Sequence, residues 1–362
     1  MKLWALLFLL LPILGCVYVG WHLWQMLPLQ NVWKTVIIVL MTACFCLLFA
    51  NIVIGLDGIP LSLARILYKV GTSSPFILLY LVMLFLVLDL GKVVHLVSPS
   101  LMKDSWAGTL IVTGIMLVVF CYGNIRYERK VRVPIELKAR TPLSQPLKVV
   151  MMSDLHLGYH NTRNDLSRWI GIINEENPDL VLMAGDIVDI SINPLLEENM
   201  AEEFRRLKAT VYTCLGNHDY YADEPKSEQF YRDANIKLLR DSSVLINNEL
   251  VVIGRDDRTN TGRKSVAALA NEAQKGKFTI LLDHQPYHLD RTEQAGIDFQ
   301  FSGHTHYGQV WPVSWIEDLI YEKAYGYHQR GDTRFYVTSG IGIWGGKFRI
   351  GTRSEYIVAT IR

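Results

Sequence analysis

The sequence predicts an α/β domain, over about residues 147 to 362, that follows four transmembrane helices. Two observations lead to this prediction. Long apolar runs fill the first third of the 362 residues, and most charged side chains come after residue 125. Beyond residue 147, short apolar runs typical of buried strands alternate with helical patterns, as they do in α/β folds.

Four apolar runs occupy the region 1–125, at residues 3–24, 32–56, 75–97 and 106–122. A helix needs about 20 apolar residues to cross the hydrocarbon core of a membrane. The first three runs reach that length, and the fourth, with 17 residues, lies at its lower edge. Four such runs leave too little polar surface for a soluble core. We therefore predict a multi-pass membrane anchor.

The basic residues that flank these runs predict the orientation of the anchor. With four spans, the amino terminus, the second loop and the region after residue 126 share one side of the membrane. That side carries Lys2, Arg65, Lys69, Arg126, Arg129, Lys130 and Arg132, and the other side only Lys34 and Lys103. Because basic loops stay cytoplasmic, we expect an inner (cytoplasmic) membrane protein with its domain on the cytoplasmic side.

Two features of the anchor allow other interpretations. A cleaved secretory signal near Cys16 is the first, but apolar sequence continues well past that residue. The second is a functional role for Asp89 and Lys92 in the third run, since charges within a membrane are often functional. They are three residues apart on a helix, so we expect them to pair.

The segment from residue 126 to residue 146 is basic and then interrupted by prolines, which is typical of a juxtamembrane linker or strand near anionic head groups. Residues before 126 hold six of the 36 Lys and Arg and three of the 35 Asp and Glu residues. The remainder is therefore close to neutral and gives no sign of nucleic-acid binding. Its one cysteine, Cys214, fits a reducing compartment.

Clusters of Asp, Asn and His follow five of the strand-like runs in the domain. The runs cover residues 147–152, 179–184, 210–215, 278–282 and 299–302, with helical patterns near 163–176, 194–208 and 263–275. The clusters that follow them are Asp154 and His156, Asp186 and Asp189, Asn217 and His218, His284, and His304 and His306. In α/β sheets, ligand sites form beyond the carboxyl ends of strands. One cluster alone would mean little, but five in succession predict a single site.

The residue types in these clusters favour metal ions. Carboxylate, amide oxygen and neutral imidazole together suit divalent Mn, Fe or Zn better than Mg or Ca. The clusters contain no cysteine, which argues against a closed structural zinc site. There are enough ligands for two ions that share a carboxylate, an arrangement that activates water for displacement at phosphorus.

The clusters also resemble the signature of the calcineurin-like metallophosphoesterases, D-x-H, GD-x-x-D, GNH-D/E, H and GH-x-H. All five blocks are present, within SDLHLG, NPDLVLMAGDIVD, CLGNHDYY, ILLDHQP and FSGHTHYGQ. These stretches are most similar to a membrane-associated bacterial branch, some of whose members hydrolyse UDP-2,3-diacylglucosamine. The resemblance implies a four-layer αββα sandwich with two mixed sheets over residues 147–362.

The resemblance also implies a role for each motif residue. One metal would be held by Asp154, His156, Asp186 and His306, and the other by Asp186, Asn217, His284 and His304. His218 would protonate the leaving oxygen, and Asp189 would orient it. Ile190 and Asp219 stand where protein Ser/Thr phosphatases have Arg and Glu, which counts against that activity. Tyr307 replaces a glycine that the branch usually has.

We therefore predict a membrane-anchored dinuclear hydrolase of phosphodiester or pyrophosphate bonds, with Mn²⁺ as the expected metal and Fe or Zn as alternatives. Its partners would be membrane lipids and a phosphoester, such as a lipid or nucleotide-lipid. Two alternatives stay open: a phosphodiesterase of soluble substrates, and a catalytically silent, metal-stabilised sensor. Arg163, Arg255 and Arg349 are candidates for contacts with substrate phosphate, although each is individually better explained as a structural or solvated arginine.

Overall fold

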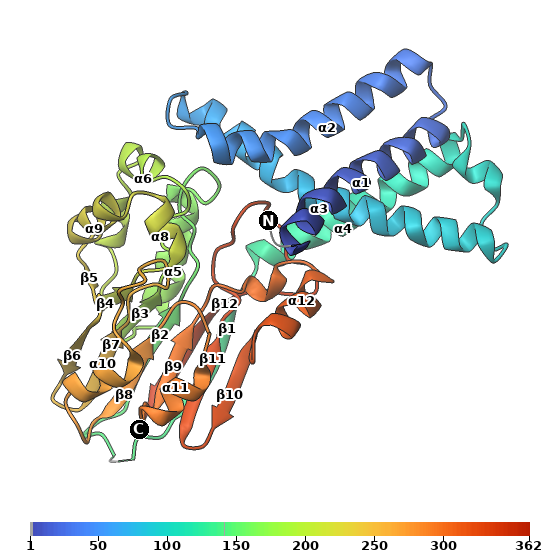
Figure 1. The fold of residues 1–362 in the computed structure, drawn as a ribbon. Helices are drawn as coiled ribbons and strands as arrows, with labels where there is room; N and C mark the ends of the chain where they lie inside the picture. The colour runs from blue at the N-terminus through green and yellow to red at the C-terminus, as the bar shows by residue number, and fades with distance from the viewer. Residues whose placement is uncertain (1–2, 141) are drawn as a thin grey trace. The chain divides into compact units, whose positions relative to one another are not determined.

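The computed structural model describes residues 3–140 and 142–362, so Lys2 and Thr141 lie outside the described residues, as do the side chains of residues 3–9. The chain divides into two compact units. The first runs to Asn124 and includes Gly345–Lys347, and the second comprises Ile125–Trp344 and Phe348–Arg362. Figure 1 shows the elements of both units.

Long helices form the first unit: α1 (Leu3–Met26), α2 (Asn31–Ile54), α3 (Leu61–Val93), the short 3-10 helix η1 (Pro99–Met102) and α4 (Trp106–Glu128). The last turn of α4, from Ile125, belongs to the second unit. Within the described residues, α2, α3 and α4 are long and apolar enough to cross a membrane. This includes the short fourth run of the sequence analysis. Helix α1 covers the first predicted run, and its crossing of a membrane stays a prediction. Helix α3 begins at Leu61, well before the predicted span at 75–97.

Polar side chains within the first unit form a cluster between α1 and α3. Lys92 Nζ lies 2.6 Å from Asp89 Oδ1, which confirms the predicted pair. Two residues of α1 join them, since the Tyr18 hydroxyl donates to Asp89 Oδ2 and His22 Nε2 lies 3.0 Å from the same oxygen. Polar groups in an apolar environment need such partners, so this cluster ties the two helices together.

Two six-stranded mixed sheets form the second unit. The first has the order β1 (Lys130–Leu137), β12 (Ser354–Ile361), β2 (Leu147–Met152), β3 (Leu180–Ala184), β4 (Thr210–Cys214) and β5 (Ile236–Leu238). The second has the order β10 (Gly326–Arg330), β11 (Thr333–Val337), β9 (Phe299–Ser302), β8 (Phe278–Leu282), β7 (Leu250–Gly254) and β6 (Ser242–Ile246). The five strand-like runs of the sequence analysis are β2, β3, β4, β8 and β9.

Strand β1 lies inside the segment at 126–146, which the sequence left open as linker or strand. It pairs in parallel with β12 along its whole length, from Lys130 opposite Ser354 to Leu137 opposite Ile361. The folded unit therefore begins before residue 147. Because its partner strand is the last in the chain, the pairing has no local signature in the sequence.

Short helices complete the second unit. They are α5 (Arg163–Glu175), α6 (Asn193–Glu197), α7 (Met200–Phe204), α8 (Asn217–Tyr221), α9 (Glu224–Asp233), α10 (Val266–Glu272), α11 (Leu289–Gln294), η2 (His306–Gly308) and α12 (Val313–Ile320). The single helix expected at 194–208 is two helices. Asn199 between them has a φ of 50°, a left-handed conformation that a helix cannot continue through.

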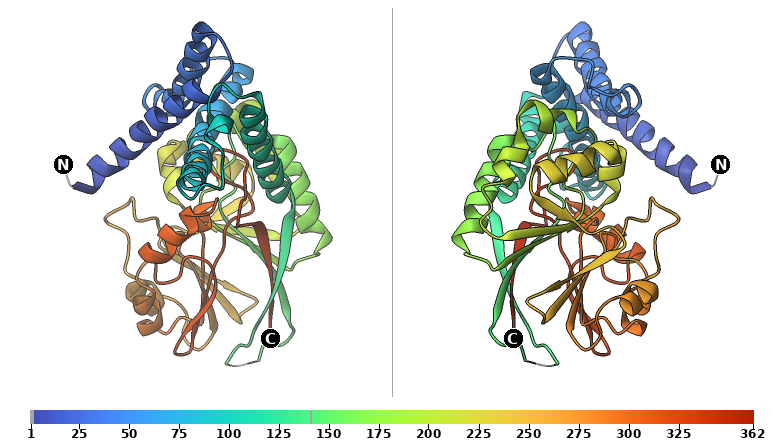
Figure 2. Two further views of the ribbon diagram at one scale, coloured as in Figure 1. Left: turned by 90° about the vertical axis from the view of Figure 1, so that its right-hand side faces the viewer. Right: turned by 90° about the vertical axis from the view of Figure 1, so that its left-hand side faces the viewer.

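Alternate residues of the strands contribute to different apolar cores. Val149, Leu182 and Leu282 belong to a core that both sheets share. Val150 and Val181 point the other way and pack with residues of α5 such as Trp169, while Val251 packs with residues of α10. The two views in Figure 2 show the helices of this unit beside its sheets. This period of two is that of strands buried on both faces.

Candidate metal centre

The predicted ligands come together because their strands end at the same edge of each sheet. Strands β2, β3 and β4 run parallel, as do β8 and β9, so their carboxyl ends lie side by side. The loops after them carry the ligands listed here: Asp154, His156, Asp186, Asn217, His284, His304 and His306. Asp189 and His218, which belong to two of the same five clusters, lie at this edge as well.

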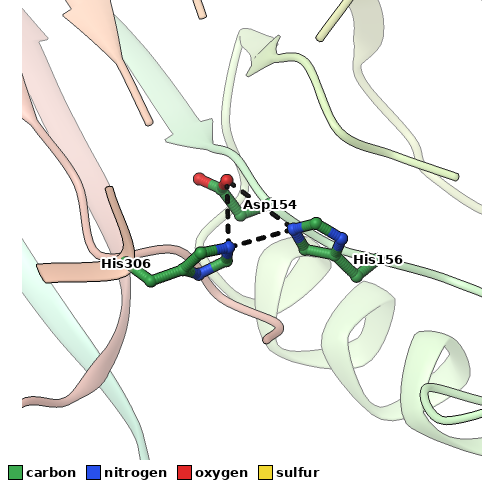
Figure 3. A group of neighbouring side chains, drawn as sticks. All are labelled: Asp154, His156 and His306. Carbon is green, nitrogen blue, oxygen red and sulfur yellow. Dashed lines mark hydrogen bonds and ion pairs between the residues drawn. The ribbon is translucent and has the colours of Figure 1, made fainter. Parts of the chain in front are cut away.

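Asp154, His156 and His306 form the first donor group (Figure 3). The Nε2 atoms of the two rings are 3.0 Å apart. Asp154 Oδ1 lies 3.8 Å from Nε2 of His156 and 3.6 Å from Nε2 of His306. The three atoms enclose one point, and ring nitrogens about 2.1 Å from a common ion would have a separation of this size.

Asp186, His284 and His304 form a second donor group. His284 Nε2 is 3.0 Å from Asp186 Oδ2, and the same oxygen is 3.6 Å from Nε2 of His156 in the first group. Asp186 therefore lies between the two groups. His284 Nδ1 is 2.7 Å from the carbonyl oxygen of Ala184, and donation there leaves the Nε2 lone pair free for a ligand.

Two properties of these residues fit divalent cations. Asn217 Oδ1 and His284 Nε2 are buried, and within the part of the chain that the structure describes neither has a partner in hydrogen-bond geometry, although Asp186 lies at ion-pair distance from His284. Asp154, Asp186 and Asp189 are at most 1% exposed, and buried carboxylates need a compensating charge. Burial lowers the pKa of His156, but Asp154 and Asp189 outweigh it and raise that pKa to about 10, a sign of strong negative potential. The residues therefore fit metal ions.

His218 and Asp189 are adjacent, as predicted. Asp189 Oδ1 lies 3.1 Å from Nδ1 of His218 and 3.2 Å from Nδ1 of His156. The His218 pair is within ion-pair distance, although its atoms lie outside hydrogen-bond geometry. Asp189, His156 and His218 also lie close enough to form a third donor group. Because Nε2 of His156 faces His306, its Nδ1 is better explained as a donor that Asp189 orients.

The backbone of the site is held in unusual conformations. Five of the predicted ligands have positive φ: Asp154 (58°), His156 (44°), Asp186 (52°), His304 (72°) and His306 (49°). Such residues cost roughly 1–3 kcal/mol each and persist where the surroundings fix them. Buried Asp219 is part of that support, since it accepts N–H groups of Asp186, Val188 and Gly216. Burial, then the charge of Asp186, raises the pKa of Asp219 to about 6.

Two residues that the sequence analysis did not single out support the first donor group. The Asn161 amide group donates to the carbonyl oxygens of Leu155 (2.8 Å) and His156 (3.1 Å), and the Tyr127 hydroxyl donates to Asn161 Oδ1 (2.7 Å). Tyr127 is in the last turn of α4, and both residues are fully buried. No motif marks Tyr127, although an aromatic residue at the end of an apolar helix could have drawn attention.

The three candidate arginines are all engaged within the second unit. Arg349 is buried and donates to the carbonyl oxygens of His306, Ser339 and Gly342. Arg255 pairs with Asp283, and Arg163 with Glu203. All three are therefore structural arginines, which is the interpretation that the sequence favours for each of them. The structure also reveals Arg258, which is exposed and has its Cζ 3.9 Å from the centre of the Tyr287 ring.

Arg258 borders the second donor group through two tyrosines. The Tyr287 hydroxyl donates to the Tyr321 hydroxyl (3.0 Å), and the Tyr321 ring centre is 6.2 Å from that of His304. Tyr307, where the branch usually has glycine, stacks on Tyr325 with ring centres 5.0 Å apart. The rim of the site is therefore aromatic, and Arg258 adds an exposed cation to it.

Comparisons with known proteins agree with this geometry. The family model of the calcineurin-like phosphoesterases matches residues 147–308. This region is a calcineurin-like metallophosphoesterase domain. A Campylobacter jejuni protein named an uncharacterized metallophosphoesterase is 29% identical over 70% of this chain and 69% of its own length. A zebrafish protein named a transmembrane protein with metallophosphoesterase domain is 29% identical over 68% of this chain and 60% of its own.

A Helicobacter pylori protein, also named an uncharacterized metallophosphoesterase, is 30% identical over 59% of both chains. The chain thus spans about three fifths of the zebrafish and Helicobacter relatives that it matches. Among solved structures, a 5'-nucleotidase precursor from Thermus thermophilus aligns over 60% of this chain and 55% of its own, with 16% identity and a TM-score of 0.38. That overlap is too low to bear on function. Residues 147–308 thus belong to a family of phosphoesterase hydrolases, and three helices of the described residues are long and apolar enough to cross a membrane.

Proposed function

We propose that this metallophosphoesterase hydrolyses phosphodiester or pyrophosphate bonds with two divalent cations, Mn²⁺ first among them. The position of Asp186 carries the proposal, because its Oδ2 lies 3.0 Å from His284 and 3.6 Å from His156, in different donor groups. One ion would be held by Asp154, His156, Asp186 and His306, and the other by Asp186, Asn217, His284 and His304. Fe or Zn would suit the same ligands.

Bound there, such cations would activate water and neutralise charge on phosphate oxygens. The chain's own residues do the rest. His218, whose side chain is 15% exposed, is accessible enough to give a proton to the leaving oxygen. Asp189 Oδ1 lies 3.1 Å from Nδ1 of His218 and would orient the ring toward the leaving oxygen. Burial raises the pKa of Asp189, but His156 and His218 outweigh it and keep the carboxyl ionised.

The substrate and the location are further parts of the proposal. Membrane-crossing helices favour a lipid or nucleotide-lipid substrate, such as a UDP-diacylglucosamine, because both would share one surface. We place the anchor in the inner membrane with four spans and the domain on the cytoplasmic side, on the charge argument above. We also expect the layer order helix–sheet–sheet–helix, which the three apolar cores of the domain support.

Two other functions remain as alternatives to a lipid substrate. A phosphodiesterase of soluble substrates would need the anchor only for its location. A catalytically silent sensor would need the ligands but not His218, and the intact pair with Asp189 counts against it.

The test is turnover of bis(p-nitrophenyl) phosphate by the full chain, stripped of metal and then given Mn²⁺, Fe²⁺ or Zn²⁺. We expect activity only with added metal, and then a preference for one member of a lipid and nucleotide-lipid panel. Absence of turnover with every metal would refute the hydrolase proposal. Turnover of soluble diesters alone would support the first alternative.

A further inference from the structure

Helix α12 presents an apolar face to solvent. Its outward side chains are Trp315 (61% exposed), Ile316 (52%), Leu319 (87%) and Ile320 (55%), and Trp311 (39%) precedes them. The spacing of one and four residues places the four helical positions on one side of the helix. We call these five residues the α12 face. Contiguous exposed apolar residues of this kind mark interaction surfaces in soluble domains.

The α12 face belongs to the rim of the metal centre. Helix α12 follows closely after η2, which contains His306 and Tyr307. The Tyr307 hydroxyl donates to Asp318 Oδ2 (3.0 Å), and the backbone N–H of Trp311 donates to the carbonyl oxygen of Ile350 (2.7 Å). The face is therefore carried by a helix that is fixed to the loop with a predicted ligand.

We propose that the α12 face inserts into the interface of a lipid bilayer and holds the rim of the metal centre at the level of the head groups. Trp, Ile and Leu on one side of a short helix are typical of elements that lie in this interface. Tryptophan in particular prefers the boundary between head groups and acyl chains.

The rest of the chain favours a bilayer over a protein partner. Three helices in the described residues are long and apolar enough to cross a membrane, and such an anchor would keep a bilayer within reach of this domain. A face of five side chains would bind lipid only weakly alone, but tethering raises its effective concentration. A stable contact with a second copy would need about 20–30 residues on each side, far more than this face offers.

The charges on α12 do not oppose the insertion. Glu317 and Asp318 lie between Ile316 and Leu319 in the sequence, and the helical geometry turns both away from the α12 face. Asp318 is engaged by Tyr307. Because the α12 face itself carries no charge, the contact should not depend on anionic lipid or on salt.

This inference extends the proposed function. If the domain hydrolyses a lipid-borne phosphoester, the α12 face explains how the substrate reaches the ligands without leaving the bilayer. That consequence rests on the proposed function, whereas the contact with lipid does not.

The test is a fluorescent probe on the full chain in phosphatidylcholine vesicles. With the native cysteines replaced by alanine, Leu319→Cys would carry an environment-sensitive dye, and Lys237→Cys, exposed on β5, would be the matched control. Acyl chains carrying bromine quench only dyes that touch them. We expect at least about a twofold loss of intensity at residue 319 and none at residue 237. High salt should not change the result.

Two outcomes would overturn the inference. A dye at residue 319 that reports water, as at residue 237, would show that the face stays in solution. A dye that reports an apolar environment but is not quenched would show that it packs on protein, either the helices of this chain or a second copy. Since Leu319 is 87% exposed, its replacement removes no core contact, and Trp315→Cys provides a second site. Turnover of a soluble diester by the labelled chain tests the proposed function separately.

Discussion

The bond between Tyr127 and Asn161 links the end of α4 to the loop that carries Asp154 and His156. We predict that Tyr127→Phe loosens this loop. The substitution keeps the ring but removes the hydroxyl that donates to Asn161 Oδ1, 2.7 Å away. Both residues are fully buried, so water cannot replace the lost donor. Leaving a buried acceptor without its partner costs about 1–3 kcal/mol.

Hydrogen exchange of the backbone amides at residues 153–161 measures this cost as local opening. At about 1.4 kcal/mol per factor of ten, exchange should accelerate by roughly 5- to 150-fold. Tyr327→Phe is the matched control, because its hydroxyl donates to Gln329 at the surface and the residue is 47% exposed. There we expect a change of less than about threefold. Unchanged exchange in Tyr127→Phe would refute a supporting role for the pair.

Three further predictions address the acid, a carboxyl on α12 and the orientation. The His218→Ala variant should keep its metal, but its kcat should fall by about 10²- to 10⁴-fold. The loss should be smaller for p-nitrophenyl than for alkyl leaving groups, because p-nitrophenolate needs little protonation. Equal losses would exclude the general-acid role. Burial, then Asp318, raises the pKa of Glu317 to about 7, so the fold favours the protonated carboxyl. Stability should fall from about pH 4.5 to 7 relative to Glu317→Gln, and parallel unfolding midpoints across that range would contradict this. A cysteine at exposed Lys138 should react with an impermeant reagent only after cells are permeabilised, and ready labelling of intact cells would place the domain outside.

The sequence predicted which side chains gather at the site better than it predicted the residues that hold the loops of the site in place. Asp154, Asp186, Asn217 and His284 follow strands with clear apolar patterns, and parallel strands bring such ends together wherever the sheet forms. Residue type and local order were therefore sufficient to predict which side chains gather at this edge, and their role as metal ligands stays a prediction. The predicted strands β2, β3, β4, β8 and β9 all formed for the same reason, since each is a short apolar run next to polar residues.

Features that depend on contacts between distant parts of the chain could not be predicted from the sequence. Strand β1 is defined by β12, more than 200 residues later along the chain. Tyr127 becomes important only because Asn161 is folded against it. The residues of the α12 face do have helical spacing in the sequence WPVSWIEDLI, but their exposure follows from the packing of the folded unit. Local patterns carry no information about which apolar residues stay uncovered.

The central claim is that Asp186 joins two metal ions in one site. Elemental analysis of the purified full chain, saturated with Mn²⁺ and then desalted, tests it directly. We predict two ions per chain for the unmodified protein and fewer for Asp186→Asn. Asp298→Asn is the matched control, since Asp298 is also a buried carboxylate but pairs with Arg140 away from the site, and it should keep two. Two ions retained by Asp186→Asn, or fewer than two in the unmodified chain, would contradict the account.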